Sequence, residues 1–554
     1  MKILQSAKLF SKNHLILLGI LLVAFALRVY GNNFGLPYEY HVDEVQYVRQ
    51  AASMGAEGLA PVWWNNPPFF KYLLLAEYGA LFLLGRFMGW HASAVEFGAL
   101  YSFDPSVLYL LGRTTSALFG TATVLLVYLT GKLAYGRRTG LIAAAFLAVT
   151  FLHVRESHFA VNDVAATFFV TLALLATVGI AKTGAWCWYG IAGLALGLGF
   201  ATKYSAIFAA APILVAHLLA RYAPTVLIKP VKWRQLAAVA VIAAVSAVVA
   251  SPYFVFVPAK VFQDAYEALY LAGQRGFDGW QIDPDGGYLF YLKTLVWGLG
   301  WPLVIVVFAG LMAAAVRHNR QDVVLLSLPV LLYLVAGRQE LYFARFILPI
   351  VPPLLVLAAY FVDILVSGFF GDSGRWFPAA ALATVLIITA PSLVDSLRLD
   401  YLLSQTDTRT LASRWIGENV AADAKIAVDW SFHGPPLSTA TRPLPGAPKR
   451  YEVIEAGGGG LADLPLDWYR KQGFQYLITS SYISELTLRD AARNEQKNSF
   501  MAGLPKSAEL VQEFLPATAG APMSFIFDEI YGPAISLWQR ERPGPVLRMY
   551  QIPP

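Results

Sequence analysis

The stretch DVAATFFVTLALLATVGIA, residues 163–181, decides the fold class, because residues 164–181 carry no charged side chain. An α-helix of this length rises almost far enough to cross the hydrocarbon core of a bilayer, which is about 30 Å thick. Similar apolar runs recur along most of the chain, which predicts a polytopic α-helical membrane protein of about eleven spans. The other runs lie at roughly 14–30, 106–133, 140–153, 189–201, 204–220, 236–257, 289–316, 323–336, 346–368 and 377–396.

The composition agrees with this prediction. Charged residues make up 14% of the 554 residues and hydrophobic residues 57%, whereas about a quarter of a soluble domain is charged. A chain of soluble domains is therefore excluded. The net charge of +6 is small enough to come from anchors at a membrane face, so no nucleic-acid partner is expected. The single cysteine, Cys187, has no partner in the chain for a disulfide.

Basic residues fall in alternate loops between the apolar runs, and such loops stay on the cytoplasmic side. With the N-terminus inside, an odd number of spans places the segment after about residue 397 outside. We therefore expect a multi-pass protein of the cell (inner) membrane, with a membrane domain at 1–396, a long first outer loop at 31–105, and an extracytoplasmic, periplasmic domain at 397–554. The basic residues are Arg137, Arg138, Lys182, Arg221, Lys229, Lys232, Arg234, Arg317, Arg320 and Arg375.

The last part of the chain alternates helix-like and strand-like segments, which predicts a small soluble α/β domain. The expected helices are 408–420 and 467–472, and the expected strands are 425–430, 474–480 and 546–552.

The first outer loop contains the segment Tyr38-Glu39-Tyr40-His41-Val42-Asp43-Glu44-Val45-Gln46-Tyr47. Adjacent acids on a helix point about 100° apart, so Asp43 and Glu44 cannot face one substrate equally. One is expected to do chemistry while the other supports it. The structural alternative is that Asp43 caps a helix at 44–54 and Glu44 complements its dipole, which is worth about 1 kcal/mol.

Several cations lie inside or beside the apolar runs, where each costs about 2.5–3.5 kcal/mol at bilayer depth. By the predicted topology they gather near the outer face, although single residues often have buried structural partners, for example Arg155 with Glu156 or Asp163. The set comprises Arg113, Arg155, Lys203 and Arg345. Lys71 lies in the same outer loop as Asp43 and Glu44, where the structural alternative is a lysine that reaches toward the lipid headgroups.

Cations beside a carboxylate at the outer boundary suit a lipid-linked phosphate that must leave. Arginine and lysine stabilise negative charge that develops on a leaving phosphate, and a carboxylate accepts the proton of an attacking hydroxyl or amine. This chemistry describes transfer of a sugar from a polyprenyl-phosphate donor.

With these residues the chain resembles the family 39 glycosyltransferases, the protein O-mannosyltransferase superfamily. It resembles more distantly the aminoarabinose transferases that modify lipid A. The resemblance spans about the first 370 residues, and the ending Tyr531-Gly532-Pro533 resembles prokaryotic members. Its motifs are Asp43-Glu44, Pro67-Pro68-x-x-Lys71, the run from Arg113 to Gly120, Asp163 opening a span, Thr202-Lys203, and Arg345-Phe346-x-Leu348-Pro349-x-x-Pro352.

The resemblance implies the GT-C membrane fold, inverting transfer from a polyprenyl-phosphate sugar, and Asp43 as the general base. Glu44 would shape the charge of Asp43 or help it hold an optional divalent cation, magnesium or manganese; no cofactor is required. The candidates for the donor phosphate are Lys71, Arg113, Lys203 and Arg345, with Lys71 preferred, and those for acceptor orientation or support are Arg155, Asp163, His158 and Tyr342.

Two other classes of protein stay open on the sequence. Intramembrane charges also line the paths of transporters and lipid flippases, and the C-terminal domain could be a binding module on a membrane scaffold. The acceptor is a glycan, a lipid or a protein. The sugar, the type of polyprenol and the oligomeric state are not specified by these residues.

Overall fold

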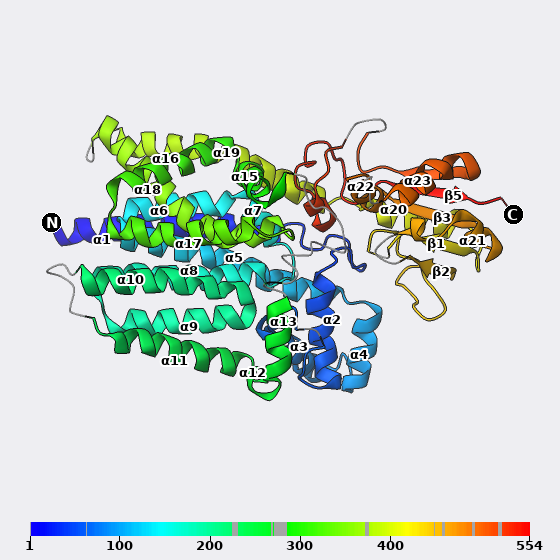
Figure 1. The fold of residues 1–554 in the computed structure, drawn as a ribbon, viewed down its shortest axis with the longest axis horizontal. Coiled ribbons are helices and arrows are strands. Elements are labelled where there is room, and N and C mark those ends of the chain that lie inside the picture. The colour runs from blue at the N-terminus through cyan, green and yellow to red at the C-terminus, as the bar shows by residue number, and fades with distance from the viewer. Residues whose placement is uncertain are drawn as a thin grey trace.

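The computed structural model describes residues 2–62, 64–223, 231–267, 270, 285–371, 376–430, 432–447, 449–456, 460–489, 494–518 and 523–553. Two of the basic residues that indicated orientation, Lys229 and Arg375, lie outside the described residues. The rest of the chain forms a helical bundle, followed by a smaller part that contains a β-sheet (Figure 1).

The long helices of the bundle run along the longest dimension of the molecule, with the N-terminus at one end and the sheet beyond the other (Figure 1). Each of the eleven apolar runs falls on one or more of these helices. They are α1 (Lys2–Val29), α5 (Ser106–Ala134), α6 (Arg137–Val149), α8 (Asp163–Thr183), α9 (Trp186–Thr202), α10 (Ala210–Tyr222), α11 (Trp233–Ala250), α15 (Gly286–Leu299), α16 (Trp301–Arg317), α17 (Arg320–Gly337), α18 (Val351–Phe370) and α19 (Phe377–Leu403).

Fewer of these helices are full spans than the number of runs suggested. Among the described residues, seven helices are long and apolar enough to cross a membrane, or eight when α15 and α16 count as one bent span. The apolar parts of α1 and α9 are shorter, and α6 has 13 residues. The prediction of a multi-pass α-helical membrane protein is confirmed.

The run at 289–316 is not one straight helix. The chain bends by 120° between α15 and α16. Gly300, at the bend, has φ +80°, a conformation that favours glycine, and Pro302 follows in the first turn of α16. The proline ring stops α15 from continuing as an α-helix, because it lacks an N–H and clashes with the preceding turn.

Small residues bring neighbouring helices of the bundle close together, as is usual where apolar helices pack in a membrane. A Cβ atom on Gly140 of α6 would meet the main chain of Tyr128 on α5. A Cβ atom on Gly197 of α9 would collide with Ser246 on α11. These glycines are therefore needed for close packing, and α9 with α11 forms an extensively packed pair.

Shorter elements cover the end of the bundle that faces the sheet (Figure 1). The first loop supplies three of them, α2, α3 and α4, and the helix expected at 44–54 is present as α2. The elements are α2 (Glu44–Glu57), α3 (Phe69–Met88), α4 (Ala94–Phe103), α7 (Phe151–Glu156), η1 (Tyr204–Ala209), α12 (Tyr253–Phe256), α13 (Pro258–Tyr266) and η3 (Ala344–Ile350).

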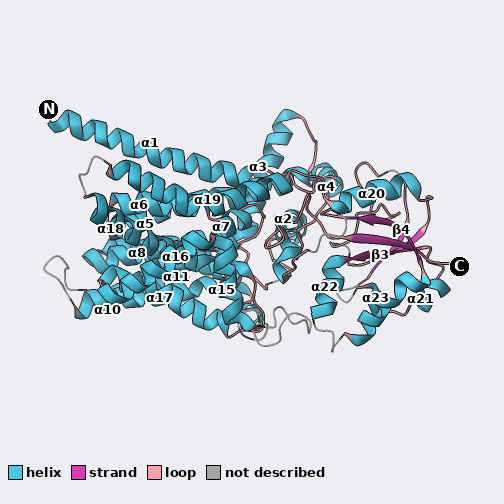
Figure 2. Cartoon of the chain, turned by 90° about the horizontal axis from the view of Figure 1, so that it is seen from above, coloured by secondary structure: helices cyan, strands magenta, loops and turns pink. Residues whose placement is uncertain are grey.

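The C-terminal part contains a five-stranded sheet of order β2-β1-β3-β5-β4, and Figure 2 shows that the labelled strands gather at this end of the molecule. The central strand β3 (Tyr476–Ser480) pairs parallel with β1 (Lys425–Val428) and antiparallel with β5 (Leu547–Gln551). These three strands and helices α20 (Thr408–Asn419) and α21 (Leu466–Lys471) confirm the predicted α/β segments.

Two strands and two α-helices of this part were not expected from the sequence. They are the edge strands β2 (Glu452–Glu455) and β4 (Glu509–Phe514), and helices α22 (Ser481–Arg489) and α23 (Glu495–Ser507). Strand β2 is largely exposed, and only one residue of β4 is buried. They therefore lack the buried apolar run that marks the central strands.

The C-terminal part is bound tightly to the bundle. Arg155 of α7 is buried and donates hydrogen bonds to the carbonyl oxygens of Asp528, Gly532 and Pro533. The backbone N–H of Ala344 donates to the Asp528 carboxylate at 3.1 Å. The short helix η5 (Phe527–Tyr531) is thus held at the end of the bundle.

Candidate active site

A cavity of about 360 Å³ lies where the bundle, the first loop and η5 meet. Six charged residues line it. Two of them, Asp264 and Glu267, lie at the end of α13. The other four interact with one another: Asp43 immediately before α2, Asp163 at the start of α8, Lys203 at the end of α9, and Arg345 in η3. All four occupy helix ends, where the chain turns. Residues that are far apart in the sequence therefore meet at one end of the bundle.

The side chain of Asp43 faces this cavity rather than its own helix. Asp43 occupies the N-cap position of α2 with helical dihedral angles and makes no side-chain capping bond. Instead its Oδ2 lies 2.8 Å from Nη2 of Arg345. The alternative that Asp43 serves as a helix cap is therefore wrong.

Arg345 is held on two sides by aromatic rings. Its guanidinium carbon lies 4.4 Å from the ring centre of Phe343 and 4.3 Å from that of Tyr531, within the range of cation–π contacts. Tyr531 also lines the cavity. A residue of the C-terminal part therefore helps to form the same site as Asp43.

Asp163 joins the two cations. Its Oδ1 forms an ion pair with Nζ of Lys203, and its Oδ2 lies 3.9 Å from Nε of Arg345. Lys203 follows the last residue of α9 with an extended backbone (φ −152°, ψ 128°), and this turn points its side chain to Asp163. Asp43, Arg345, Asp163 and Lys203 form an alternating chain of charges without net charge.

Burial and neighbouring charges set the protonation of this cluster. Burial raises the pKa of Asp43, the positive charge of Arg345 opposes this, and the negative charge of Asp163 adds to it. Burial also raises the pKa of Tyr531, so its hydroxyl stays protonated. Asp43 is therefore a better proton acceptor than an ordinary exposed aspartate.

Glu44 points away from the cavity. Its two carboxylate oxygens accept hydrogen bonds of 2.8 and 2.7 Å from Arg113, and both side chains are fully buried. The N–H of Ala160 also donates to Glu44, at 2.8 Å. Arg113 does not line the cavity, so the prediction that it contacts the donor phosphate is corrected: it binds Glu44 and the carbonyl oxygens of Asn32 and Phe34.

The same geometry corrects the predicted cation site at Asp43 and Glu44, because the two carboxylates do not face a common point. Among the described residues, no group of three or more His, Cys, Asp or Glu side chains is arranged to hold a metal ion.

Lys71, the preferred phosphate ligand, also lies outside the cavity lining. Its ammonium group donates to Oε1 of Gln50 at 2.7 Å and lies 5.8 Å from the ring centre of Tyr47. Burial lowers the pKa of Lys71 to about 8. Because Tyr47 does line the cavity, Lys71 supports the wall of the site from behind.

The remaining candidates do not line this cavity either. Arg155 forms an ion pair with Glu156, the structural alternative raised by the sequence, and anchors the segment at 528–533. His158 lies 3.0 Å from the carbonyl oxygen of Tyr30 and 3.3 Å from the Asp400 carboxylate. Tyr342 is buried, with its ring 4.9 Å from that of Phe290.

The sequence did not identify Tyr531 as a site residue. The motif Tyr531-Gly532-Pro533 was visible, but nothing local connects it with Asp43 near the other end of the chain. Gln46, Tyr47 and Asn162 also line the cavity. Their only signal was proximity in sequence to Asp43 and Asp163.

Residues 110–250 match the family model described as dolichyl-phosphate-mannose-protein mannosyltransferase. No curated protein matches the chain.

Two kinds of solved structure share the fold. The oligosaccharyltransferase of Archaeoglobus fulgidus in the apo form has a TM-score of 0.55 at 13% identity, over 98% of this chain and 88% of that one. ArnT from Cupriavidus metallidurans bound to undecaprenyl phosphate has a TM-score of 0.50 at 13% identity, over 97% of both chains. A complex of archaeal AglB from A. fulgidus with an inhibitory peptide and a dolichol-phosphate has a TM-score of 0.52 at 15% identity, over 87% of this chain and 71% of that one.

These likenesses establish the fold over nearly the whole chain, and the family model matches its central helices. The chain is therefore a multi-pass membrane protein that shares the fold of these solved structures, and residues 110–250 are similar to the mannosyltransferase family.

Proposed function

We propose that the protein transfers a sugar from a polyprenyl-phosphate donor to an extracytoplasmic acceptor with inversion, and that Asp43 is the general base. The observation that carries this proposal is the convergence of Asp43, Asp163, Lys203 and Arg345 on one cavity of a GT-C fold. A carboxylate and two cations at one end of a membrane bundle are the groups that this reaction requires.

The two cations suit the leaving group. When the bond between the anomeric carbon and the phosphate oxygen breaks, both electrons go to that oxygen, and the polyprenyl phosphate gains a second negative charge. Arg345 and Lys203 stabilise this charge by charge-assisted hydrogen bonds. A phosphate that binds Arg345 also competes with Asp43 for the guanidinium and leaves the carboxylate available for the acceptor.

The attack of the acceptor group on the anomeric carbon needs a proton acceptor. Asp43 takes the proton of the acceptor group as that group attacks the anomeric carbon, which inverts its configuration. The raised pKa of Asp43 strengthens its basicity. Asp163 holds Lys203 and Arg345 in place through its two oxygens.

The cavity also has an apolar side for a lipid. Leu332, Val335 and Ala336 of α17 line it next to Phe208 and Phe346. The ArnT and AglB structures contain undecaprenyl phosphate and dolichol-phosphate, and the matching family is described by dolichyl-phosphate-mannose. These similar proteins support a polyprenyl-phosphate donor. The proposed location of the reaction is the periplasmic face of the inner membrane.

The test is consumption of radiolabelled undecaprenyl- and dolichyl-phosphate sugars by purified protein in nanodiscs. We expect at least one donor to be consumed, and Asp43→Asn to lower the rate by about 100- to 10,000-fold, the usual contribution of a general base. Asp104→Asn is the matched control, because Asp104 is exposed, accepts hydrogen bonds from Ser106 and does not line the cavity.

Substantial transfer by Asp43→Asn would refute the role of this residue. Movement of an intact lipid-linked sugar across the membrane, without its consumption, would support the transporter alternative.

A further inference from the structure

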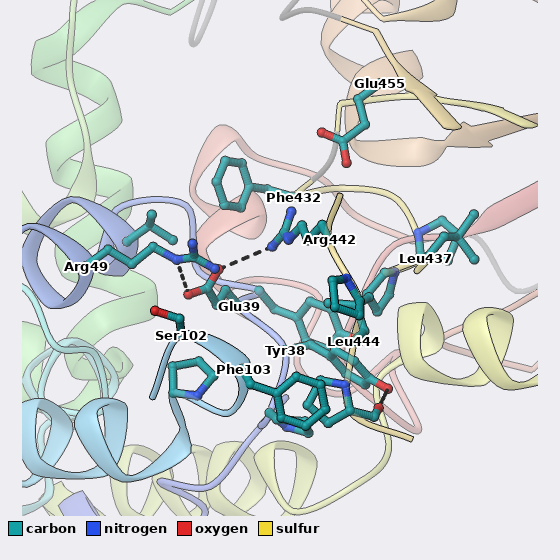
Figure 3. A pocket seen from close by; sticks show the side chains of 18 residues that line it. Tyr38, Glu39, Arg49, Ser102, Phe103, Phe432, Leu437, Arg442, Leu444 and Glu455 are labelled. Atoms are coloured by element: carbon teal, nitrogen blue, oxygen red, sulfur yellow. Dashed lines mark hydrogen bonds and ion pairs between the residues drawn. The ribbon is translucent and has the colours of Figure 1, made fainter. Parts of the chain in front are cut away.

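A second cavity, of about 330 Å³, lies between the first loop and the C-terminal part, apart from the site of Asp43. Figure 3 shows Glu39 at its centre between Arg49 and Arg442, with Phe432 on one side and Tyr38 and Phe103 on the other. Pockets between two structural units are common places for small ligands, and this volume is at the lower end of their usual range of about 300–1,000 Å³.

The charged centre of this cavity is preorganised. Glu39 accepts two hydrogen bonds of 2.6 Å from Arg49 and one of 2.8 Å from the hydroxyl of Tyr109, and Nη2 of Arg442 lies 3.5 Å away. The Glu39 side chain is only 5% exposed, but those of Arg49 and Arg442 are 50% and 53% exposed. The arginines are therefore fixed by Glu39 while part of their N–H groups stays accessible to a ligand.

The walls combine flat rings with rigid backbone. Phe103 is half exposed, and Tyr38 is held by a hydrogen bond from its hydroxyl to the carbonyl oxygen of Pro445. Six prolines line the cavity: Pro37, Pro105, Pro435, Pro436, Pro443 and Pro445. Because proline has no backbone N–H, these walls are poorly suited to pairing with the main chain of a bound peptide.

Aromatic rings beside fixed guanidinium and carboxylate groups suit a sugar, whose ring presents apolar C–H faces between hydroxyl groups. We propose that this cavity, centred on Glu39, Arg49, Arg442, Tyr38, Phe103 and Phe432, binds a saccharide unit of the acceptor. That this saccharide belongs to the acceptor rests on the function proposed above.

The position of the cavity supports this connection. Tyr38, Glu39 and Tyr40 line it, and Asp43 lines the other site. Four residues of extended chain span at most about 14 Å, so a short oligosaccharide is long enough to reach from one site to the other. The segment at 38–43 thus links recognition of the acceptor to the proposed base.

The test is direct binding of soluble mono- to tetrasaccharides of hexoses and N-acetylhexosamines to the purified full-length protein, by saturation-transfer NMR. We expect at least one saccharide to bind, and Phe103→Ala and Arg442→Ala each to weaken its binding tenfold or more. Two variants on opposite walls guard against misfolding of either one. Phe500→Ala, in a separate cavity of about 320 Å³ on the C-terminal part, is the matched control and binds like the parent.

Asp43→Asn separates this proposal from the catalytic one, because it is expected to lose transfer and to bind the saccharide with the parent's affinity. The saccharide proposal is overturned if no member of the panel binds, if both cavity variants bind it like the parent, or if a peptide library binds this cavity instead. A lipid-linked saccharide tested beside the free one distinguishes a lipid-borne acceptor from a soluble glycan, and binding of either in this cavity supports the proposal.

Discussion

Asp43 and Glu44 are neighbours in sequence and have opposite environments. Asp43 faces a cavity and pairs with Arg345, whose side chain is 10% exposed, whereas Glu44 and Arg113 are fully buried against each other. Both pairs join a carboxylate to an arginine. The difference shows that access to a cavity, rather than the presence of charge in an apolar chain, separates a candidate catalytic pair from a structural one.

The largest expected effect concerns the structural pair. Arg113→Met leaves the Glu44 carboxylate buried without its cation, which should destabilise the folded protein by about 3–5 kcal/mol. A thermal unfolding curve of the purified protein in detergent checks this through a lower midpoint. The double variant Glu44→Gln, Arg113→Met should regain part of the loss, because it removes the unpaired charge. Normal stability with lost donor binding would instead make Arg113 a phosphate ligand.

Substitution of Arg345 should mainly lower the reaction rate, whereas substitution of Arg113 should mainly lower stability. Arg345→Met is expected to lower kcat by about 100- to 1,000-fold, the usual effect of removing one donor to a developing anion. Arg345→Lys should restore part of the rate, because it keeps the charge but not the planar, forked donor geometry. Steady-state kinetics with a lipid-linked sugar measure both. Equal rates for the Met and Lys variants would contradict a role for this charge at the phosphate.

The pH dependence of the reaction tests the state of Asp43. A base acts only when unprotonated, so activity should fall as the pH falls through its pKa, by about tenfold per unit on the acidic side. Because burial raises this pKa, the loss should begin at a higher pH than for an exposed aspartate, whose pKa is about 3.9. His41 does not account for this loss of activity at acidic pH, since burial and the charge of Arg345 hold its pKa well below the ordinary value.

The positive charge of Arg345 lowers the pKa of Asp43. Arg345→Gln should therefore move the acidic limb of the kcat/KM profile to still higher pH, in addition to slowing the reaction. A limb that stays in place in this variant would assign the titration to another group.

The sequence predicted the bundle because hydropathy is a local property: α5 and α8 are each long and apolar enough to cross a membrane. It also identified Asp43, Asp163, Lys203 and Arg345, because polar side chains at the ends of apolar helices are costly unless paired. It did not show that these four line the cavity while Lys71 and Arg113 do not. Lys71 is bound by Gln50 and Arg113 by Glu44, and these contacts depend on how α2 packs against α3 and α5, which residue spacing does not reveal.

The contribution of the C-terminal part was the hardest to predict. Tyr531 reaches Arg345 because Arg155 and Ala344 hold the neighbouring backbone and Asp528. Each of these contacts joins segments that are far apart in sequence. The bend at Gly300, in contrast, has a local cause in Gly300 and Pro302, but the hydropathy of the run continues through it and conceals the break.

Lys71 gives the smallest expected effect and sharpens the comparison between lining and supporting residues. Its ammonium group bonds Gln50 and lies over Tyr47, so Lys71→Met should act only by shifting Tyr47. We expect kcat/KM to fall by less than about tenfold, which corresponds to about 1.4 kcal/mol of transition-state stabilisation. Lys71→Met combined with Gln50→Leu should cost less than the sum of the single changes, because the two groups satisfy each other. A loss above 100-fold confined to the KM of the donor would place the Lys71 ammonium at the phosphate when substrate is bound, and the wall of the cavity would then have to rearrange around Tyr47.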